Sequence, residues 1–474
     1  MTSRLLIPGA LALVLLAAGC VTLEPPLPAA EAGVAAAWPI PEATGDRPQT
    51  REPGSVPMAQ VAEIGWRDFL VDDRLEALVA RALAANRDLR VAVLDVERAR
   101  ALYRIQRSER LPSVSGGLEM TRTGGEDAPT TSSYSANVGV AGFELDLFGR
   151  VKSLGEAALR EYFASGEARR AAQLSLVAEV AGAYLTLAAD RELVRVARAA
   201  LDNREKWFGL TQKRFDLGAV SRLDLAQART LVEGARADAA RYEGQVARDI
   251  NALALLVGAP VEESLLPARF DESVKGLDPV PAGLPSEVLL RRPDVLQAEQ
   301  RLRAANASIG AARAAFFPSI RLTGAVGTAS DELSGLFSGG SFAWSFLPRI
   351  EVPIFQAGRL AANLGVAKAD RDIALARYEK SIQAGFREVA DALASSRALA
   401  AQRAALEAQV AAATQAEDLS RARYDAGADS FLALLDAQRT LYAAQQALVA
   451  TRLAEQSNRV TLYKVLGGGW KERT

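Results

Sequence analysis

The chain has 474 residues, a formal net charge of −1, 24% charged residues and no histidine. It lacks the basic excess that marks a nucleic-acid-binding protein. Without histidine, Ser-His-Asp and Cys-His chemistry is excluded and the commonest metal ligand is missing. A hydrolase that uses carboxylates stays open as an alternative, but we expect no enzyme, no catalytic residue, no cofactor and no metal site.

Residues 1–19 have the features of a lipoprotein signal peptide. A basic residue is followed by an apolar stretch that is too short to span a bilayer comfortably, and small residues precede Cys20, the only cysteine. This ending resembles a bacterial lipobox, so we expect Cys20 to be lipidated; an ordinary cleaved signal with a chance cysteine is the alternative. Residues 20–67 are rich in proline, which favours an extended N-terminal arm between the anchor and the folded body.

The rest of the chain is an internal duplication. The segment 214–223 reappears as 423–432 at an offset of 209, and the same offset relates Gly258 to Gly467. We therefore divide the body into a first repeat, an equatorial linker, a second repeat and a C-terminal tail: residues 68–258, 259–283, 284–467 and 468–474.

Each repeat is predicted to contain the same elements in the same order. A helix ends at Pro112 or Pro318, two alternating segments follow, and then a very long helix, a glycine turn and a second helix. A helix of about 66 residues is about 100 Å long. This is far more than a bilayer requires, so the helices must project into an aqueous compartment. The predicted helices are 82–110, 150–215 and 221–257 in the first repeat, and 293–316, 358–424 and 430–466 in the second.

The alternating segments are predicted to be transmembrane strands, two at about 113–147 and two at about 319–354. Period-two alternation with one apolar face is the transmembrane-barrel pattern. The edge of a soluble β-sandwich has the same pattern, but no other apolar element is left to cover this face. Four strands cannot close a barrel, and open edges are not tolerated in lipid. Several chains must share one barrel, and three would supply twelve strands.

Six motifs of one known family are spread over the mature part of the chain: 143–150, 284–294, 304–318, 353–355, 434–439 and 466–470. They resemble the outer-membrane factor family of TolC-like export ducts, most closely the lipoprotein branch typified by OprM and NodT. The resemblance implies a mainly α fold with transmembrane β, in which a homotrimer forms a twelve-stranded outer-membrane barrel and a periplasmic α-barrel. It also implies a passive duct for small molecules, served by a periplasmic adaptor protein and an inner-membrane pump of the RND type. A lipid-anchored coiled coil or adhesin is the alternative from another class.

The two glycine turns are predicted at the free end of the helical cylinder. Gly218 and Gly427 suit left-handed helix stops, and Ser221 and Ser430 suit the following N-caps. A plain turn explains these four residues but not the charges that recur beside them, so we expect this tip to contact the adaptor. The candidate residues are Arg214, Asp216, Gly218, Ser221, Arg423, Asp425, Gly427, Asp429 and Ser430.

Leu432 and Asp436 follow the second turn at a spacing of four, which puts them on one helix face. Threefold symmetry would turn each into a ring. An apolar ring blocks ions by dewetting, and an acidic ring selects cations. The resemblance implies a constriction at these two positions, whereas Ala433 stands where the TolC branch has a second aspartate. A solvated helix residue is the alternative for Asp436.

Overall fold

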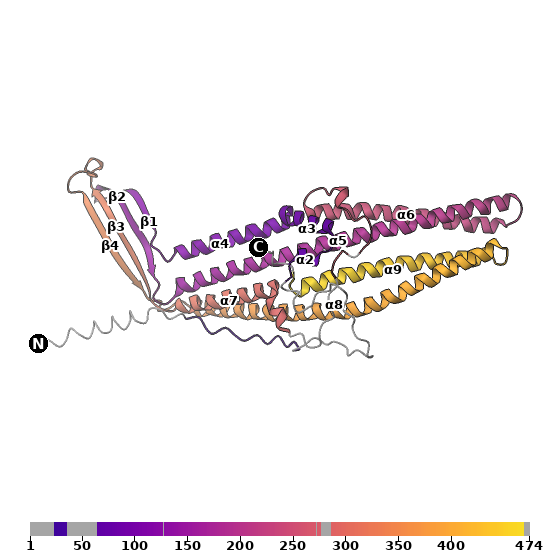
Figure 1. Ribbon diagram of the computed structural model, residues 1–474. Coiled ribbons are helices and arrows are strands. Elements are labelled where there is room, and N and C mark those ends of the chain that lie inside the picture. The colour runs from indigo at the N-terminus through magenta and orange to yellow at the C-terminus, as the bar shows by residue number, and fades with distance from the viewer. Residues whose placement is uncertain (1–22, 36–63, 127, 272, 276–285, 469–474) are drawn as a thin grey trace. The chain divides into compact units, whose positions relative to one another are not determined.

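The computed structural model describes residues 23–35, 64–126, 128–271, 273–275 and 286–468. The predicted signal peptide, residues 1–19, and Cys20 lie outside these residues. The chain divides into two compact units (Figure 1). The strand unit contains the described part of Met1–Ala32 together with Leu94–Glu167 and Leu296–Ser381, and the hairpin unit contains the described parts of Gly33–Val93, Ala168–Val295 and Ile382–Thr474.

The predicted long helices and strands are present, mostly with ends close to those expected. The strands are β1 Val114–Gly125, β2 Ala128–Leu145, β3 Ser319–Ser330 and β4 Phe342–Glu351. The α-helices are α2 Trp66–Phe69, α3 Asp73–Ala85, α4 Arg87–Ser108, α5 Arg150–Asp216, α6 Arg222–Val257, α7 Pro293–Ala314, α8 Arg359–Asp425 and α9 Phe431–Val465. Short 3₁₀ segments lie at η2 Glu263–Leu265, η3 Ser286–Arg291 and η4 Leu333–Gly335. The paired elements have matching lengths: α5 and α8 have 67 residues each, and α4 and α7 have 22 each.

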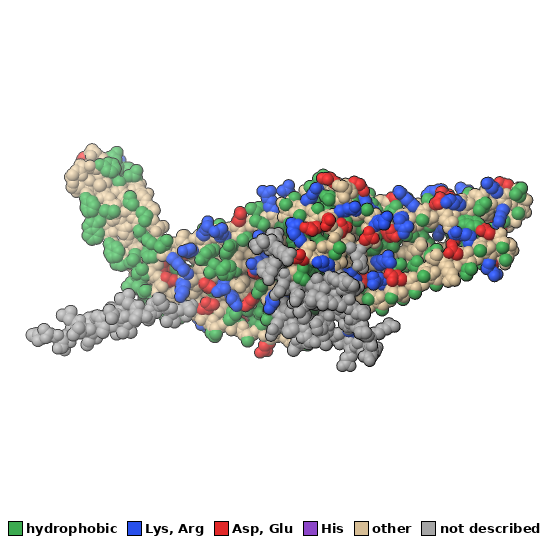
Figure 2. All heavy atoms as spheres, in the orientation of Figure 1, with side chains coloured by type: hydrophobic (Ala, Val, Ile, Leu, Met, Phe, Trp, Pro, Cys, Tyr) green, Lys and Arg blue, Asp and Glu red, His purple; other side chains and the backbone are tan. Residues whose placement is uncertain are grey.

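The strand unit contains one antiparallel sheet in the order β1-β2-β3-β4. Its register places the apolar residues of successive strands opposite one another, so that Val138, Val326 and Trp344 form one cross-strand row. Directly paired residues lie on the same face of a sheet. The large side chains of this face are exposed, 69% for Phe342 and 71% for Trp344. Figure 2 shows hydrophobic side chains gathered over the strands, in contrast to the mixed charges over the helices.

A bulge in β2 keeps the apolar face continuous. The pairing of β2 with β3 shifts between Val140 and Phe143, and Gly142 lies there with a φ of 65°. The Gly142 N–H donates to Thr323 Oγ1 at 3.0 Å. The extra residue moves the apolar positions from even to odd numbers, so Phe143 and Leu145 stay on the same face as Val140.

The hairpin unit is built from two helical hairpins, α5 with α6 and α8 with α9. Its buried side chains include Tyr184 and Leu185 of α5, and Tyr463 of α9 stacks on Phe69 with ring centroids 4.0 Å apart. Among the described helices, only α5 contains an 18-residue window with a mean hydropathy as high as 1.3, and half of that window is buried. Apolar windows of this kind also occur in buried core helices, so it does not indicate a helical membrane span.

The prediction of a single helix over 82–110 is wrong. The chain breaks at Asn86, whose ψ of 132° is extended, and this separates α3 from α4. Asn86 Oδ1 accepts from the Leu89 N–H at 2.9 Å, as an N-cap does, and Asn86 Nδ2 donates to the Leu256 carbonyl at 2.9 Å. The second bond joins the break to α6, which is distant in sequence.

Candidate functional site

The two glycine turns have the same backbone. The Ala219 N–H donates to the Arg214 carbonyl and the Ala428 N–H to the Arg423 carbonyl, both at 2.8 Å. Gly218 and Gly427 have φ values of 74° and 71°. This pattern is the Schellman motif, in which a left-handed residue ends the helix and satisfies its last carbonyls. Figure 1 shows both turns at the same end of the hairpin unit.

The two N-cap serines after the turns donate their backbone N–H to carboxylates at different positions. In the first turn, Ser221 and Asp224 form a capping box: the Asp224 N–H donates to Ser221 Oγ, and Asp224 Oδ2 accepts from the Ser221 N–H at 3.0 Å. In the second turn, Asp429 Oδ1 accepts from the Ser430 N–H at 2.9 Å, while Arg423 Nε donates to Asp429 Oδ2 at 3.1 Å. The Ser430 N–H and the Arg423 guanidinium lower the pKa of Asp429.

The tip ends of the two hairpins contact each other, and of the side chains involved only Arg214 was among the predicted tip residues. The guanidinium of Arg214 lies 5.0 Å from the ring centroid of Tyr424, and the Trp207 ring meets the same tyrosine edge-on at 5.6 Å. Ala228, Leu231, Phe431 and Leu435 form a buried cluster beneath them. The aromatic residues at positions 424 and 431, close to the turn, were the sequence signal that could have predicted this contact. The remaining candidates, Asp216 and Asp425, are exposed.

Leu432 and Asp436 lie together on the exposed face of α9. Leu432 is 63% exposed and Asp436 is also exposed, whereas Leu434 and Leu435 are buried. The helix therefore turns its bulky apolar residues toward the neighbouring hairpin and presents one leucine and one carboxylate away from it. This geometry suits a pair of residues that act outside the packed core of the monomer.

Arg292 is a buried arginine to which the sequence analysis assigned no role. Arg292 is 8% exposed and donates to Asp294, to Glu388 Oε2 at 2.7 Å and to the Val465 carbonyl at 3.1 Å. It joins the start of α7 to α8 and to the end of α9, beside a cavity of about 700 Å³. Its place in the motif 284–294 was the available signal.

Known proteins match almost the whole chain. The sequence model of the family described as "Outer membrane efflux protein" matches residues 78–259 and 284–468. The antibiotic efflux pump outer membrane protein ArpC of Pseudomonas putida is 46% identical over 466 residues, which cover 96% of this chain and 94% of ArpC. Outer membrane protein OprJ of Pseudomonas aeruginosa is 46% identical over 421 residues, 87% of this chain and 88% of OprJ. The open state of the Neisseria gonorrhoeae MtrE outer membrane channel matches with a TM-score of 0.84 and 40% identity, covering 95% of this chain and 99% of MtrE.

Proposed function

Because this chain belongs to the outer membrane efflux protein family, we propose that it is the outer-membrane duct of a tripartite efflux pump. The observation that carries the proposal is the four-stranded sheet. Its apolar face is exposed, and no other strand of the described residues pairs with the outer edge of β1 or of β4. An apolar outer face and a polar inner face are what a membrane barrel needs. The opposite face fits an aqueous lumen, since Gly117, Asn137, Gly327 and Ala343 form one of its rows. The family is one of ducts and not of enzymes, as the sequence predicted.

Three copies are proposed to share one barrel. Unpaired strand edges cannot remain in the hydrocarbon layer, where no water satisfies their N–H and C=O groups. Pairing β4 of one copy with β1 of the next removes every edge, and three copies give a closed barrel of about twelve strands, wide enough for a lumen. Within each copy, 68–258 and 284–467 remain our proposed repeats.

The partners and the anchor follow from the same scheme. An inner-membrane pump of the RND type would supply the energy, and a periplasmic adaptor would dock at the glycine turns. ArpC is named as part of an antibiotic efflux pump, which supports small organic molecules as the cargo class.

Lipidation of Cys20 stays a proposal. The intact mass of the protein extracted from membranes tests it, and an unmodified Cys20 contradicts it.

Leu432 and Asp436 are proposed to form the narrowest point of the closed duct. Their shared exposed face supports this role, because three copies around an axis would present three leucines and three carboxylates to the centre.

Mass measurement in mild detergent, followed by recording in planar bilayers, tests the proposal. We expect three copies per particle and discrete ion-conducting steps. A monomer that inserts stably, or a trimer that inserts without conducting, contradicts the proposed duct.

A further inference from the structure

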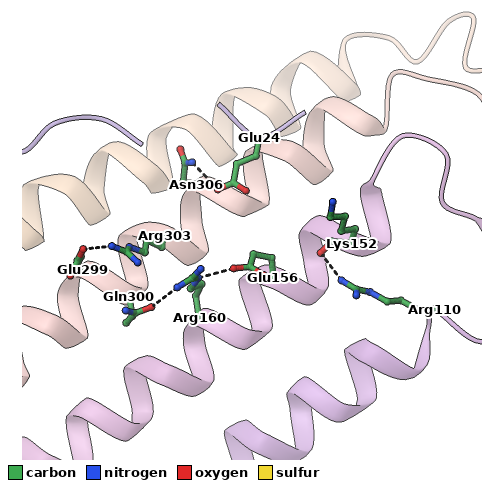
Figure 3. A network of polar contacts seen from close by, with 9 residues as sticks. All are labelled: Glu24, Arg110, Lys152, Glu156, Arg160, Glu299, Gln300, Arg303 and Asn306. Atoms are coloured by element: carbon green, nitrogen blue, oxygen red, sulfur yellow. Dashed lines mark hydrogen bonds and ion pairs between the residues drawn. The ribbon is translucent and has the colours of Figure 1, made fainter. Parts of the chain in front are cut away.

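A cavity of about 490 Å³ lies in the strand unit between the N-terminal arm, α5 and α7, with Arg110 at its side. Figure 3 shows the polar side chains around it. The arm is held by α7: Asn306 Nδ2 donates to Glu24 Oε1 at 2.9 Å and to the Pro25 carbonyl at 2.8 Å. Asn306 is only 1% exposed, and Glu24 and Pro25 of the arm line the cavity. The arm therefore forms one wall of the cavity through buried hydrogen bonds.

Positive charge exceeds negative charge around this cavity. Its lining includes four cations, Arg110, Lys152, Arg160 and Arg303, and two carboxylates, Glu24 and Glu156. Two of the cations already have carboxylate partners: Arg160 donates to Glu156 at 2.7 Å, and Arg303 pairs through Nη2 with Glu299 of α7. Arg110 Nη2 donates to the main-chain oxygen of Lys152 at 3.3 Å, and no carboxylate of the described residues forms an ion pair with Arg110 or Lys152.

Two polar atoms at the cavity are buried and, within the described part of the chain, lack a hydrogen-bond partner. They are Nε of Arg303 and Oδ1 of Asn306. A buried donor without a hydrogen-bond partner destabilises the folded protein. An anionic ligand in the cavity would satisfy the Arg303 donor, and a water or a hydroxyl group of the ligand would satisfy Asn306.

Two glycines make room for this arrangement. A Cβ atom on Gly155 of α5 would lie 3.1 Å from Nη2 of Arg110. A Cβ atom on Gly310 of α7 would lie 2.8 Å from Ser153 Oγ and 3.1 Å from the Glu24 nitrogen of the arm. Glycine within a helix costs stability, so both positions favour the close approach of Arg110 and of the arm.

The duplication does not account for the cations. The positions that correspond to Arg110, Lys152 and Arg160 in the second repeat are Phe316, Ala361 and Ala369, and the position that corresponds to Arg303 in the first repeat is Glu97. At these four positions the other repeat therefore carries no cation.

The cavity lies close to the ends of the strands along the chain. Arg110 precedes the first residue of β1, Val114, by four positions, and Lys152 follows the last residue of β2, Leu145, by seven. The exposed apolar face of these strands marks the hydrocarbon layer, and the polar headgroup layer begins where that face ends. Arg110 and Lys152 therefore fall at the depth of phospholipid headgroups on the periplasmic side.

We propose that this cavity, formed where the arm meets Arg110, Lys152 and Arg303, binds the phosphate of a phospholipid headgroup from the periplasmic leaflet. The inference rests on the proposed membrane duct. Guanidinium and ammonium groups are the usual partners of phosphate oxygens, and basic pockets at the membrane surface hold anionic headgroups. The bound lipid would tie the arm and the first turns of α5 to the membrane surface.

Native mass spectrometry of the detergent-solubilised full chain tests the site with three probes. They are dioctanoyl phosphatidylglycerol, which is an anionic phosphodiester, dioctanoyl phosphatidylcholine and inorganic phosphate. We expect saturable binding of phosphatidylglycerol, weaker binding of phosphatidylcholine and little binding of inorganic phosphate. The double variant Arg110→Gln, Lys152→Gln should weaken phosphatidylglycerol binding by more than about tenfold, because two charge-assisted contacts are lost.

Matched controls keep the result interpretable. Lys368→Gln removes an exposed cation of α8 in the same unit and should leave binding unchanged. Arg303→Lys keeps the charge but removes the Nε donor, and should weaken binding even if the double variant fails to fold. Equal binding by the wild type and these site variants, or binding of inorganic phosphate without the diester, overturns the inference. A protein that conducts in bilayers but binds no headgroup contradicts only this site, whereas one that does not conduct contradicts the proposed duct.

Discussion

The two tip turns have one backbone and two sets of side chains. Both end a 67-residue helix with a left-handed glycine and begin the next helix with a serine cap. In the first turn the N-cap N–H is satisfied by Asp224, three residues inside the helix, whereas in the second it is satisfied by Asp429, one residue before the cap. The second turn is thereby tied to Arg423 and is followed by Leu432 and Asp436, whose counterparts in the first repeat are Leu223 and Gln227.

This difference shows how a duplicated unit acquires separate roles. The glycine and serine positions set the turn, and both repeats need them for the same backbone reason. Side chains that make none of these turn hydrogen bonds are free to serve other purposes. An acid at position 436 is such a side chain, and it distinguishes the helix that carries the proposed gate from its counterpart in the first repeat.

The largest expected effect is on conductance. Leu432→Ala should raise the resting single-channel conductance several-fold, because an apolar constriction that excludes water is lost. Asp436→Ala should reduce the selectivity for cations. Leu223→Ala is the matched control, since this leucine is 65% exposed at the corresponding position of the first repeat, and it should leave both properties unchanged. Equal effects of Leu223→Ala and Leu432→Ala in bilayer recordings would remove the functional distinction between the turns.

The second expected effect is common to both repeats. Gly218→Ala and Gly427→Ala should each destabilise the protein by about 1–2 kcal/mol, because alanine is strained at positive φ. Gly234→Ala is the opposite control: this glycine lies within α6 and a Cβ there meets nothing within 4 Å. It should stabilise the helix by roughly 0.5–1 kcal/mol. Thermal unfolding in detergent distinguishes the two signs, and no loss of stability in either turn variant would contradict the Schellman assignment.

A third difference between the repeats should appear as pH dependence. Asp249 of α6 is 8% exposed beside Asp190 of α5, whereas Asn458 occupies the position that corresponds to Asp249 in the second repeat. Burial, with the hydrogen bond to Asp249 and its charge, raises the pKa of Asp190 to about 7, although Arg241 and Arg248 oppose this. The folded state then holds a proton that the unfolded state has already released above about pH 4.

Stability should therefore fall as the pH rises from about 4 to about 7, and then stay level. Asp249→Asn copies the second repeat and should flatten this part of the profile. Unfolding temperatures of the wild type and the variant, measured in detergent across this range, check the expectation. Parallel profiles for the two proteins would show that Asp249 does not raise the pKa of Asp190 in the folded state.

The smallest expected effect concerns the exposed ion pair of the second turn. Asp429→Asn should lower stability slightly near neutral pH, because Arg423 and the Ser430 N–H both favour the charged carboxylate. Since its pKa is lowered, its contribution is fully present above about pH 4 and is lost as the pH falls through the lowered value. Amide hydrogen exchange at the tip should therefore differ between the wild type and Asp429→Asn at neutral pH and converge in acid. A difference that persists in acid contradicts this account.

Much of the fold could be predicted because its signals are local. The ends of α5 and α8 follow from a glycine and a serine beside each turn, and the predicted ends lie within one residue of Asp216 and Asp425. The break at Asn86 could not be predicted in the same way. Its side chain bonds to Leu256, and nothing near Asn86 in the sequence announces a partner 170 residues away.

The same division applies to the candidate sites. A spacing of four residues already placed Leu432 and Asp436 on one helix face, and the structure leaves that face exposed. The contact of Arg214 with Tyr424 and the pairing of Arg423 with Asp429 were not evident, because both depend on how the chain folds around the turns.

The sequence by itself determined the alternating strands, the long helices, and the prolines and glycines that end the helices of each repeat. These features depend on neighbours within a few residues. The tertiary structure alone decided that the bulge at Gly142 keeps the apolar face continuous and that the arm meets α7 at Asn306. It also decided that Arg110 and Arg303, which lie in different repeats, line one cavity. These features require segments distant in the chain to meet, and hydrophobic periodicity specifies which face of an element is covered but not which segment covers it.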